Sequence, residues 1–316
     1  MSARDPVSVL LPTLEWGDAC RDVAAALHPG DELLVLCDAE TDPVASHDPP
    51  DGVEILVTGE PTGCSGKANA LAHDMEHARH DRFVWTDDDF ERSSAWLDNL
   101  VEAGMEHGPA SAIPLFTGDG WWRLVEPWYG ALFTLLFYFQ IGGVANTAWG
   151  GGVTFTRAEL LVDVPTFADE LRGVLSDDYL LTQRLSAVYP VRSLLTPVTV
   201  PGDFDSVRHR VVRFTRIVGV NEGWRGLAAY ALVTPVALLS PLVVASFSTI
   251  GFAGIYALLG LKRSTFLLAY PCLLLLPIVT LVSFVVTDFH WAGRWYRFAN
   301  DGSVRVLDPP AGRNDG

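Results

Sequence analysis

Lysine and positive charge are scarce in this sequence. It has only two lysines beside 20 arginines, and 38 acidic residues, 25 of them Asp, give a formal net charge of -16. Such a charge keeps a protein soluble by self-repulsion and indicates a surface adapted to high salt, as in a halophilic organism, or else a GC-rich genome that favours Asp and Arg. The negative field argues against nucleic acid as a partner, because binding phosphates requires a basic face.

Paired cysteines are also absent. The four cysteines are scattered, with no C-x-x-C spacing and no metal-binding pattern. This argues against a zinc site or a disulfide framework and favours buried thiols in a reducing compartment. No signal peptide precedes the first apolar segment, which begins at Val7, so we expect the first domain to remain in the cytoplasm.

Charge disappears almost completely from two long stretches in the last third of the chain. Residues 226–261 and 264–287 contain no charged side chain, and each exceeds the ~20 residues that cross a bilayer. We therefore predict transmembrane helices over 226–287, where the first stretch is either one long span or a bent hairpin. The arginines of the juxtamembrane segment 206–225 place its entry on the cytoplasmic side. Lys262, Arg263, Arg294 and Arg297 also favour the cytoplasmic side, so we expect 288–316 there too. Simple crossings cannot satisfy all of these charges, which leaves the number of full crossings open.

The first two thirds of the chain alternate between apolar strands and helices. Strands are predicted at 7–12, 32–37, 53–57 and 82–86, with helices at 18–28 and 66–79. This order predicts an α/β domain over residues 1–205 with a Rossmann-like, mostly parallel sheet covered on both faces. Ligands gather at the carboxyl ends of the strands in such sheets. Within this domain, the aromatic-rich segment 121–147 is either interfacial at a membrane surface or a core helix that covers the sheet.

Two groups of paired acids follow this pattern. Asp87-Asp88-Asp89 comes directly after a predicted strand, where carboxylates at Asp87 and Asp89 can share a Mg²⁺ or Mn²⁺ ion that holds a nucleotide diphosphate. The alternative is an ordinary turn of a highly acidic protein. Asp177-Asp178 begins a predicted helix, where the pair is either a helix cap or, in its position behind the acid turn, the site of a general base.

Two further segments are candidates for ligand binding. Arg210 and Arg213 lie three residues apart before the first apolar run, where they can clamp a diphosphate or simply fix membrane topology. Gly150-Gly151-Gly152 lacks dinucleotide-binding spacing and is expected to allow close approach of the backbone to a ligand. The dispersed His209 and His290 are expected to be bystanders.

In their order along the chain, these segments resemble the membrane-anchored, ceramide-glucosyltransferase-like branch of the family 2 inverting glycosyltransferases, which have a GT-A fold. The resemblance covers nearly the whole chain. It rests on Thr13 and Glu15 after the first strand, Cys37-Asp38-Ala-Glu-Thr-Asp42, Gly66-Lys67-Ala-Asn-Ala-Leu71, Asp87-x-Asp89, Ser176-Asp177-Asp178, Arg210-Val-Val-Arg213-Phe214, and Trp291-Ala-Gly-Arg294-Trp-Tyr296 with Asp301-Gly302.

The resemblance implies a role for each matching residue. Asp178 is the catalytic base, and Asp87 and Asp89 hold Mg²⁺ or Mn²⁺. The residues implied to bind the donor nucleotide are Pro12, Glu15, Asp38, Lys67, Asp87, Arg210 and Arg213, and those implied on the acceptor side are Asp177, Phe214 and Trp149. The sequence departs from the family at Phe214, where Trp is usual, at Cys37, where an acid is usual, and in lacking an N-terminal membrane helix.

The implied activity is inverting, metal-dependent transfer of a sugar from a nucleotide-diphosphate sugar, such as a UDP-sugar, to a lipid acceptor. The enzyme would be a multi-pass protein of the cell membrane with its catalytic domain in the cytoplasm. One alternative is an inactive membrane scaffold of the same fold, for which Phe214 is the only direct hint. Another is a processive polysaccharide synthase, for which the hydrophobic part is small.

Overall fold

The computed structural model describes residues 4–142, 146–222, 233–298 and 304–307. Parts of the predicted interfacial, transmembrane and C-terminal segments, together with Asp301-Gly302 of the resemblance, lie outside these residues. The chain forms two compact units. Unit 1 comprises Met1–Pro114, Gln140–Pro197 and Ser303–Val306, and unit 2 comprises Leu115–Phe139, Val198–Gly302 and Leu307–Gly316. The end of the catalytic domain at residue 205 stays a prediction.

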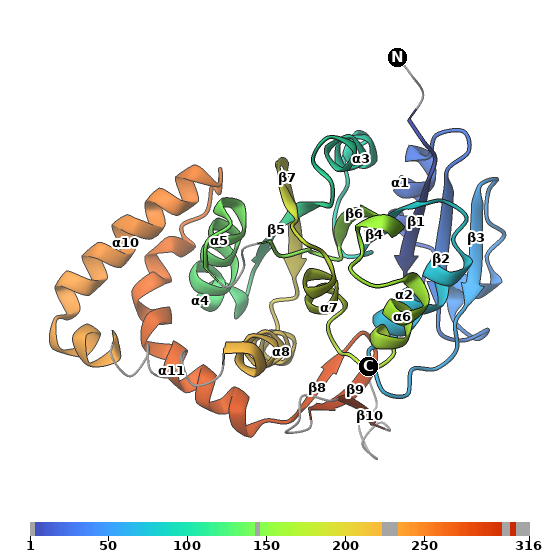
Figure 1. Cartoon of the computed structure of the whole chain (residues 1–316). Coiled ribbons are helices and arrows are strands. Elements are labelled where there is room, and N and C mark those ends of the chain that lie inside the picture. The colour runs from blue at the N-terminus through green and yellow to red at the C-terminus, as the bar shows by residue number, and fades with distance from the viewer. Residues whose placement is uncertain (1–3, 143–145, 223–232, 299–303, 308–316) are drawn as a thin grey trace. The chain divides into compact units, whose positions relative to one another are not determined.

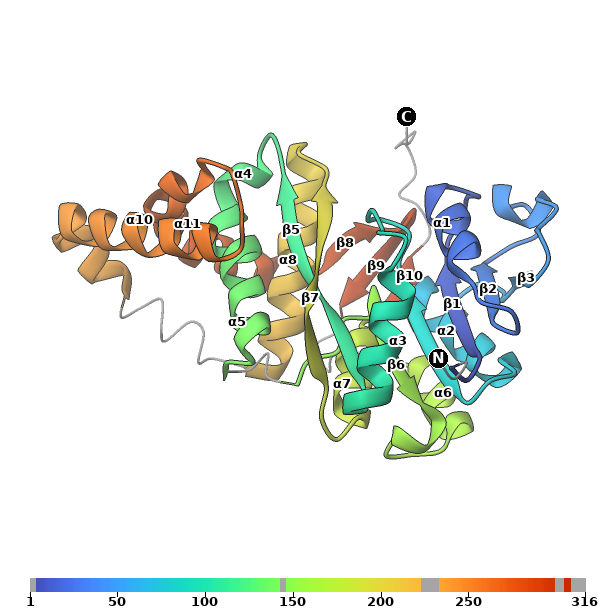
Figure 2. The same cartoon turned by 90° about the horizontal axis from the view of Figure 1, so that it is seen from above.

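A seven-stranded sheet runs in the order β3-β2-β1-β4-β6-β5-β7 (Figures 1 and 2). Four strands coincide with those predicted and pair in parallel: β1 (Val7–Pro12), β2 (Glu32–Cys37), β3 (Val53–Val57) and β4 (Arg82–Thr86). Next to β4, β6 (Gly152–Thr156) is antiparallel to both β4 and β5 (Ala110–Gly118). The chain passes between the units within β5 and within β7 (Tyr189–Val200).

The helices of unit 1 are α1 (Asp18–Ala26), α2 (Gly66–His77), α3 (Trp96–His107), α6 (Val164–Leu171) and α7 (Asp177–Arg184), with short 3-10 turns at η1 (Pro43–Ser46) and η4 (Arg157–Glu159). Large side chains such as Trp85, Phe155 and Phe167 fill a core between the sheet and α2 and α6. The predicted α/β class is confirmed, and all four cysteines of the chain are buried thiols.

Unit 2 is mainly helical. After β5 come α4 (Trp122–Val125), the π-helix η2 (Glu126–Leu132) and α5 (Phe133–Phe139), which account for most of the aromatic-rich segment. After β7 come α8 (Phe204–Glu222), a helical piece at 233–239, α10 (Pro241–Leu258), η5 (Thr265–Leu268) and α11 (Ala269–Val285). The antiparallel hairpin of β8 (Asp288–Trp291) and β9 (Arg294–Phe298) follows. The last described strand of the chain is β10 (Val304–Leu307).

Two helices in the described part of the chain are long and apolar enough to cross a membrane: Pro241–Leu258 and Thr265–Ser283. Both lie inside the predicted region 226–287. Within 121–147, Trp122 and Phe137 are buried, whereas Trp121 and Phe139 are exposed. This segment therefore both packs inside unit 2 and presents aromatic side chains at its surface.

Candidate functional site

The carboxyl ends of β1, β2 and β4 bring the predicted residues of unit 1 to one edge of the sheet. Pro12 ends β1, Asp38 follows β2, and Asp87 follows β4, and these three strands are parallel neighbours. The Thr13 hydroxyl donates a hydrogen bond of 2.6 Å to Asp88 Oδ2, which fixes the acid turn after β4 against the end of β1. The exposed Glu15 follows in the same loop.

Lys67, at the start of α2, gathers the candidate acids around its ammonium group. Its Nζ atom lies 2.6 Å from Asp87 Oδ1, 3.0 Å from Asp177 Oδ2 and 3.9 Å from Asp178 Oδ1. The Lys67 side chain is 13% exposed and that of Asp177 only 4%, so these charges interact with little screening by water. The structure thus joins the acid turn after β4 to the acid pair of α7 through one lysine.

The Asp177-Asp178 pair is not the cap of α7. Ser176 is the N-cap residue, and its side chain accepts a hydrogen bond from Tyr179 N. The two acids occupy the first turn, where the positive end of the helix dipole favours carboxylates. Asp178 Oδ1 also accepts a 2.6 Å hydrogen bond from the backbone N–H of Gly150. With the cap supplied by Ser176, the two carboxylates face the lysine.

The protonation states of Asp178 and Lys67 follow from their burial and from the neighbouring carboxylates. Burial raises the pKa of the Asp178 carboxyl well above its usual value, and the charge of Asp177 raises it further, against the lowering effects of Lys67 and the Gly150 N–H. Burial alone would lower the pKa of Lys67, but the carboxylates of Asp177, Asp87 and Asp178 outweigh it and raise that pKa well above its usual value. Lys67 therefore stays charged, while Asp178 holds a proton to a higher pH than an ordinary Asp.

Gly150 and Gly151 let the backbone approach the acids closely. A Cβ atom on Gly150 would lie 2.3 Å from Asp178 Oδ1 and 2.5 Å from Asp177 Oδ2. A Cβ atom on Gly151 would lie 2.8 Å from Asp87 Oδ2 and 2.3 Å from the ring of Trp149. These two glycines therefore bring the backbone close to the carboxylates of the site, and the expected close approach to a ligand stays a prediction. Trp149 itself is buried and packs against Phe90, so its acceptor-side role stays a prediction.

We expect Gly150→Ala to lower the sugar transfer that the sequence resemblance implies by about a hundredfold, because a displacement of the carboxylates by about 1 Å is enough for a loss of that size. The measurement is the initial rate of nucleoside diphosphate release at saturating donor. Gly17→Ala is the matched control, since no atom lies within 4 Å of the added Cβ there. Equal rates for the two variants would contradict a catalytic role for these carboxylates.

The acid turn also has a partner that no sequence motif indicated. Arg92 donates to the Thr86 hydroxyl at 2.7 Å and to the carbonyl oxygen of Asp87, and its guanidinium lies 3.9 Å from the ring centroid of Phe90. Burial lowers the pKa of Arg92 to about 10, against the opposing charges of the turn, so it remains charged at neutral pH. Arg92 holds the turn that carries Asp87 and the exposed Asp89.

The oxygen donors of the acid turn fit the predicted ion. Mg²⁺ and Mn²⁺ prefer carboxylate oxygens, and the contact of Asp87 with Lys67 is made by its Oδ1 atom. Whether Asp87 and Asp89 hold such an ion stays a prediction.

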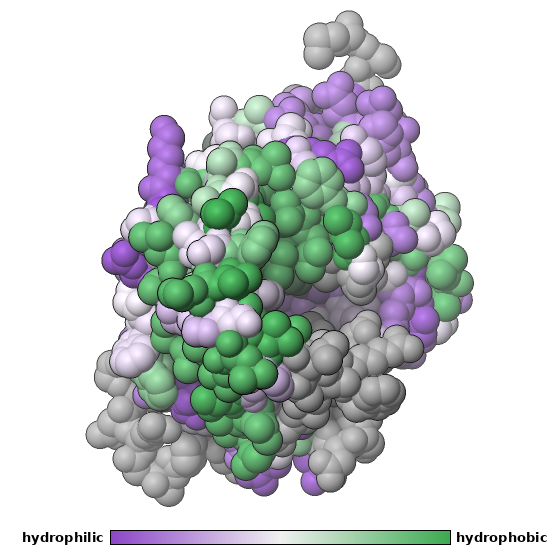
Figure 3. Space-filling view, turned by 90° about the vertical axis from the view of Figure 1, so that its left-hand side faces the viewer, coloured by the Kyte–Doolittle hydropathy of each residue, from purple (hydrophilic) through white to green (hydrophobic). Residues whose placement is uncertain are grey.

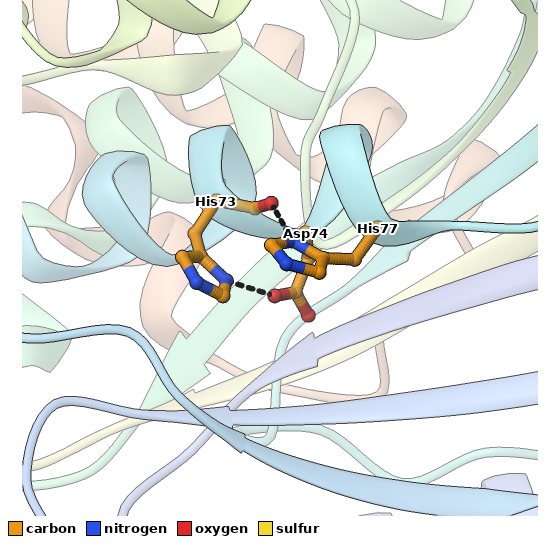
Figure 4. Close-up of side chains that lie close together, drawn as sticks. All are labelled: His73, Asp74 and His77. Atoms are coloured by element: carbon orange, nitrogen blue, oxygen red, sulfur yellow. Dashed lines mark hydrogen bonds and ion pairs between the residues drawn. The ribbon is translucent and has the colours of Figure 1, made fainter.

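A different donor set lies farther along α2 (Figure 4). Among the described residues, His73, Asp74 and His77 have ligand atoms within 4.8 Å of one another. His73 Nδ1 bonds to the buried Asp74 at 2.8 Å, and His77 Nδ1 bonds to the carbonyl oxygen of His73 at 2.7 Å. Imidazole-rich sites suit zinc and related metals better than Mg²⁺. This cluster therefore offers a control for any metal measurement on the acid turn.

Unit 2 contains a basic pocket of about 360 Å³ on α8 and the β8–β9 hairpin. Arg210 and Arg213 both line it, and the Arg213 guanidinium stacks 4.2 Å from the ring centroid of Trp291. His209 and His290 line it as well, and the backbone N–H of His290 donates to His209 Nδ1 at 3.2 Å. The fold brings these histidines to the arginines, and the expectation that they are bystanders stays a prediction.

Phe214 lies beside this pocket on α8. Its ring packs against Phe116 with a centroid separation of 5.4 Å, and against Phe133 at 6.5 Å. The guanidinium groups of Arg210 and Arg213 lie 5.9 and 5.6 Å from its centroid. Phe214 therefore packs beside the two arginines, and its acceptor-side role stays a prediction.

Comparisons with known proteins give distant structural likenesses only. No family model and no curated protein matches the sequence. Glucosyl-3-phosphoglycerate synthase from Mycobacterium tuberculosis in complex with phosphoglyceric acid aligns at 17% identity and a TM-score of 0.37, over 61% of this chain and 70% of that one. The same enzyme with Mn²⁺, UDP-glucose and glycerol 3-phosphate aligns at 19% identity and a TM-score of 0.34, over 61% of this chain and 70% of that one. Bifunctional IspDF from Campylobacter jejuni aligns at 11% identity and a TM-score of 0.36, over 59% of this chain and 49% of that one. These scores assign neither fold family nor activity.

Proposed function

We propose that the chain is a membrane-attached, inverting glycosyltransferase of the GT-A fold that transfers a sugar from a nucleotide-diphosphate sugar, such as a UDP-sugar, to a lipid acceptor. The observation that carries this proposal is the cluster of Lys67, Asp87, Asp177 and Asp178 at the carboxyl edge of the sheet. It combines a candidate metal-binding acid turn with a carboxyl group of raised pKa, which suits general base catalysis. The ordered sequence motifs around these residues support the same reading.

In the proposed reaction, the carboxylate of Asp178 accepts the proton of the acceptor hydroxyl as its oxygen attacks the anomeric carbon. The bond from that carbon to the diphosphate oxygen breaks, and the nucleoside diphosphate leaves with the bonding electrons. Lys67 keeps the Asp177-Asp178 pair and Asp87 in place through its contacts of 2.6 to 3.9 Å. A Mg²⁺ or Mn²⁺ ion held by Asp87 and Asp89 would supply charge neutralisation to the diphosphate.

The donor's phosphate oxygens are assigned, as part of the proposal, to Arg210 and Arg213. Paired guanidinium groups recognise phosphate oxygens with strong, charge-assisted hydrogen bonds. The cation–π contact of Arg213 with Trp291 limits the rotamers of that arginine, which lowers the entropy lost on binding. Pro12, Glu15 and Asp38 are proposed to contact the nucleotide from the loops after β1 and β2.

The lipid acceptor is proposed from the apolar character of unit 2. Large side chains such as Leu239, Leu242 and Phe247 are 84%, 83% and 75% exposed on or beside α10. Exposed apolar surface of this kind marks a membrane or partner contact, and attachment to a membrane brings a lipid hydroxyl within reach of a cytoplasmic enzyme. The inactive-scaffold alternative predicts no turnover with any donor, whereas the processive-synthase alternative predicts a polymeric product.

We expect Asp89→Ala to weaken Mn²⁺-dependent donor binding by roughly tenfold or more, because one of two proposed carboxylate ligands is lost. Calorimetric titration of UDP-glucose in Mn²⁺ and in EDTA measures the effect. His77→Ala is the matched control, since it removes a potential metal ligand from the cluster on α2. Donor binding that EDTA does not change, or that His77→Ala weakens in place of Asp89→Ala, would overturn the metal assignment.

A further inference from the structure

We propose that α10 and α11 lie in the plane of one leaflet of the lipid bilayer, with their exposed apolar side chains in its hydrocarbon, so that both ends of α11 stay on the same side of the membrane as α8. The inference rests on the proposed membrane attachment and specifies its geometry. It replaces the predicted transmembrane crossings with a monotopic insertion. The membrane partner would then be the hydrocarbon of a single leaflet.

The surface of α10 and α11 requires a cover that the described part of the chain does not supply. Only 11% of the residues in the apolar window of α10 are buried, and 33% in that of α11. On α10, Ile250 is 71% exposed, and on α11, Val285 is 78% exposed. Hydrophobic side chains gather over the face that carries α10 (Figure 3). With no charged side chain on either helix, lipid is the cover that matches this surface.

The connection between α10 and α11 is held at a polar site. Glu126 is fully buried, and its Oε1 atom accepts hydrogen bonds from Arg263 Nε at 3.0 Å, from Tyr256 at 3.2 Å and from the Thr265 hydroxyl. Arg263 also lies 3.3 Å from Asp119, whose side chain is 86% exposed. A buried carboxylate paired in this way is costly to break. The exposed acid at its edge places the start of α11 beside water.

The far end of α11 is held by an arginine of α8. Arg216 donates hydrogen bonds to the backbone carbonyl oxygens of Ser283, at 2.5 Å, and Val286, at 3.2 Å. Charged arginines are driven out of bilayer hydrocarbon toward water and lipid headgroups. The same helix carries further arginines at positions 208, 210 and 213. The end of α11 is therefore tied to a strongly basic helix that belongs at the membrane surface.

The two anchors belong to one packed group of elements in unit 2. The Tyr129 hydroxyl lies 3.0 Å from Thr215 Oγ1, which joins η2 to α8. Tyr129 follows Glu126 by three residues in η2, and Thr215 directly precedes Arg216. In addition, the indole N–H of Trp128 donates to the carbonyl oxygen of Ala269 at 2.9 Å. Both ends of α11 are thus bound by neighbouring polar side chains of the same group.

A full crossing would separate these anchors by the hydrocarbon core. The core is about 30 Å thick, and a 19-residue helix such as Thr265–Ser283 reaches only about 28 Å. Crossing would therefore place either the Glu126–Arg263 pair or Arg216 at the opposite face of the membrane. Helices that lie in the plane of one leaflet leave both pairs at the headgroup level.

Accessibility labelling tests the inference in inside-out membrane vesicles from expressing cells. Single cysteines are introduced by Met105→Cys on α3, Lys262→Cys between α10 and α11, and Ala292→Cys between β8 and β9. The native cysteines are buried and give a low background. We expect an impermeant maleimide to label all three positions equally without detergent. Labelling of position 262 or 292 only after detergent would overturn the in-plane arrangement, while membrane attachment would stand.

Vesicle flotation separates this outcome from a failure of attachment itself. Purified protein is mixed with liposomes of phosphatidylcholine and phosphatidylglycerol, and the floating fraction is measured. We expect the double variant Leu242→Glu, Phe247→Glu to bind at least about tenfold more weakly, since a carboxylate is strongly disfavoured in hydrocarbon. The matched control Met105→Glu, Leu161→Glu changes residues that are 56% and 62% exposed in unit 1. Absence of flotation by the wild-type protein would refute membrane attachment and the in-plane arrangement together.

Discussion

Replacement of Asp178 by Asn is expected to lower turnover by about a thousandfold and to leave donor affinity within about twofold, because a general base contributes roughly 10²–10⁴-fold and acts on the acceptor. Asn keeps the size of the side chain and can still accept from the Gly150 N–H. It cannot take up a proton. The measurement is kcat from nucleoside diphosphate release, with donor affinity measured separately by calorimetry.

Asp169→Asn is the matched control for this variant. It makes the same chemical change on α6, at a side chain that is 81% exposed and lies outside the cluster. We expect it to retain wild-type turnover. Substantial turnover by Asp178→Asn would place the base elsewhere, whereas a loss of donor affinity equal to the loss of turnover would make Asp178 a donor-binding residue.

The raised pKa of Asp178 also predicts the pH dependence of the reaction. A base must be ionised to act, so kcat should rise with pH through the folded-state pKa of Asp178, which burial places well above the usual value near 4. Because the Lys67 charge lowers this pKa, the rising limb of a Lys67→Met variant should lie at higher pH than that of the wild type. A limb that stays in place after this substitution would separate Lys67 from the titrating group.

The sheet shows which structural features the sequence could predict. The apolar strands β1 to β4 were predicted from continuous runs such as Glu32–Cys37, because buried parallel strands require them. The strands β5 and β7 were missed since Pro114 interrupts the first and Pro190 and Pro197 the second, and proline argues against a strand. Strand β6, the antiparallel neighbour of β4 and β5, begins at Gly152 in the glycine run, which the sequence alone does not identify as a strand start.

The site shows a different limit. Motif order along the chain indicated Lys67, Asp87 and Asp178 as candidate site residues, but it could not show that the ammonium of Lys67 contacts acids from two segments about 90 residues apart. Arg92 gave no signal because its partners are backbone and hydroxyl oxygens of the turn itself. His209 and His290 are 81 residues apart, and only the packing of β8 beside α8 brings them together.

The loss of Lys67 should destabilise the fold most at high pH. We expect Lys67→Met to lower the free energy of unfolding by about 3 kcal/mol at pH 8, because the substitution leaves buried carboxylates without their cation. Lys262→Met is the matched control: it removes the only other lysine in the chain, which is exposed, so a change of no more than about 0.5 kcal/mol is expected.

The pH dependence of this loss follows from the direction of each pKa shift. The folded-state pKa of Lys67 is raised, so the contribution of its own titration to stability is fully present below the pKa of an unfolded lysine and is lost only as pH rises through the folded value. Between pH 5 and 8 this contribution is constant.

Asp178 also has a raised pKa, so the folded chain binds its proton more tightly, and stability falls as pH rises from the unfolded value of 3.8. Without Lys67 that pKa rises further, which extends the fall to higher pH. Urea titrations at pH 5 and pH 8 should therefore show a smaller deficit for Lys67→Met at pH 5, and an equal deficit at both would mean that the lysine contributes packing but no charge compensation.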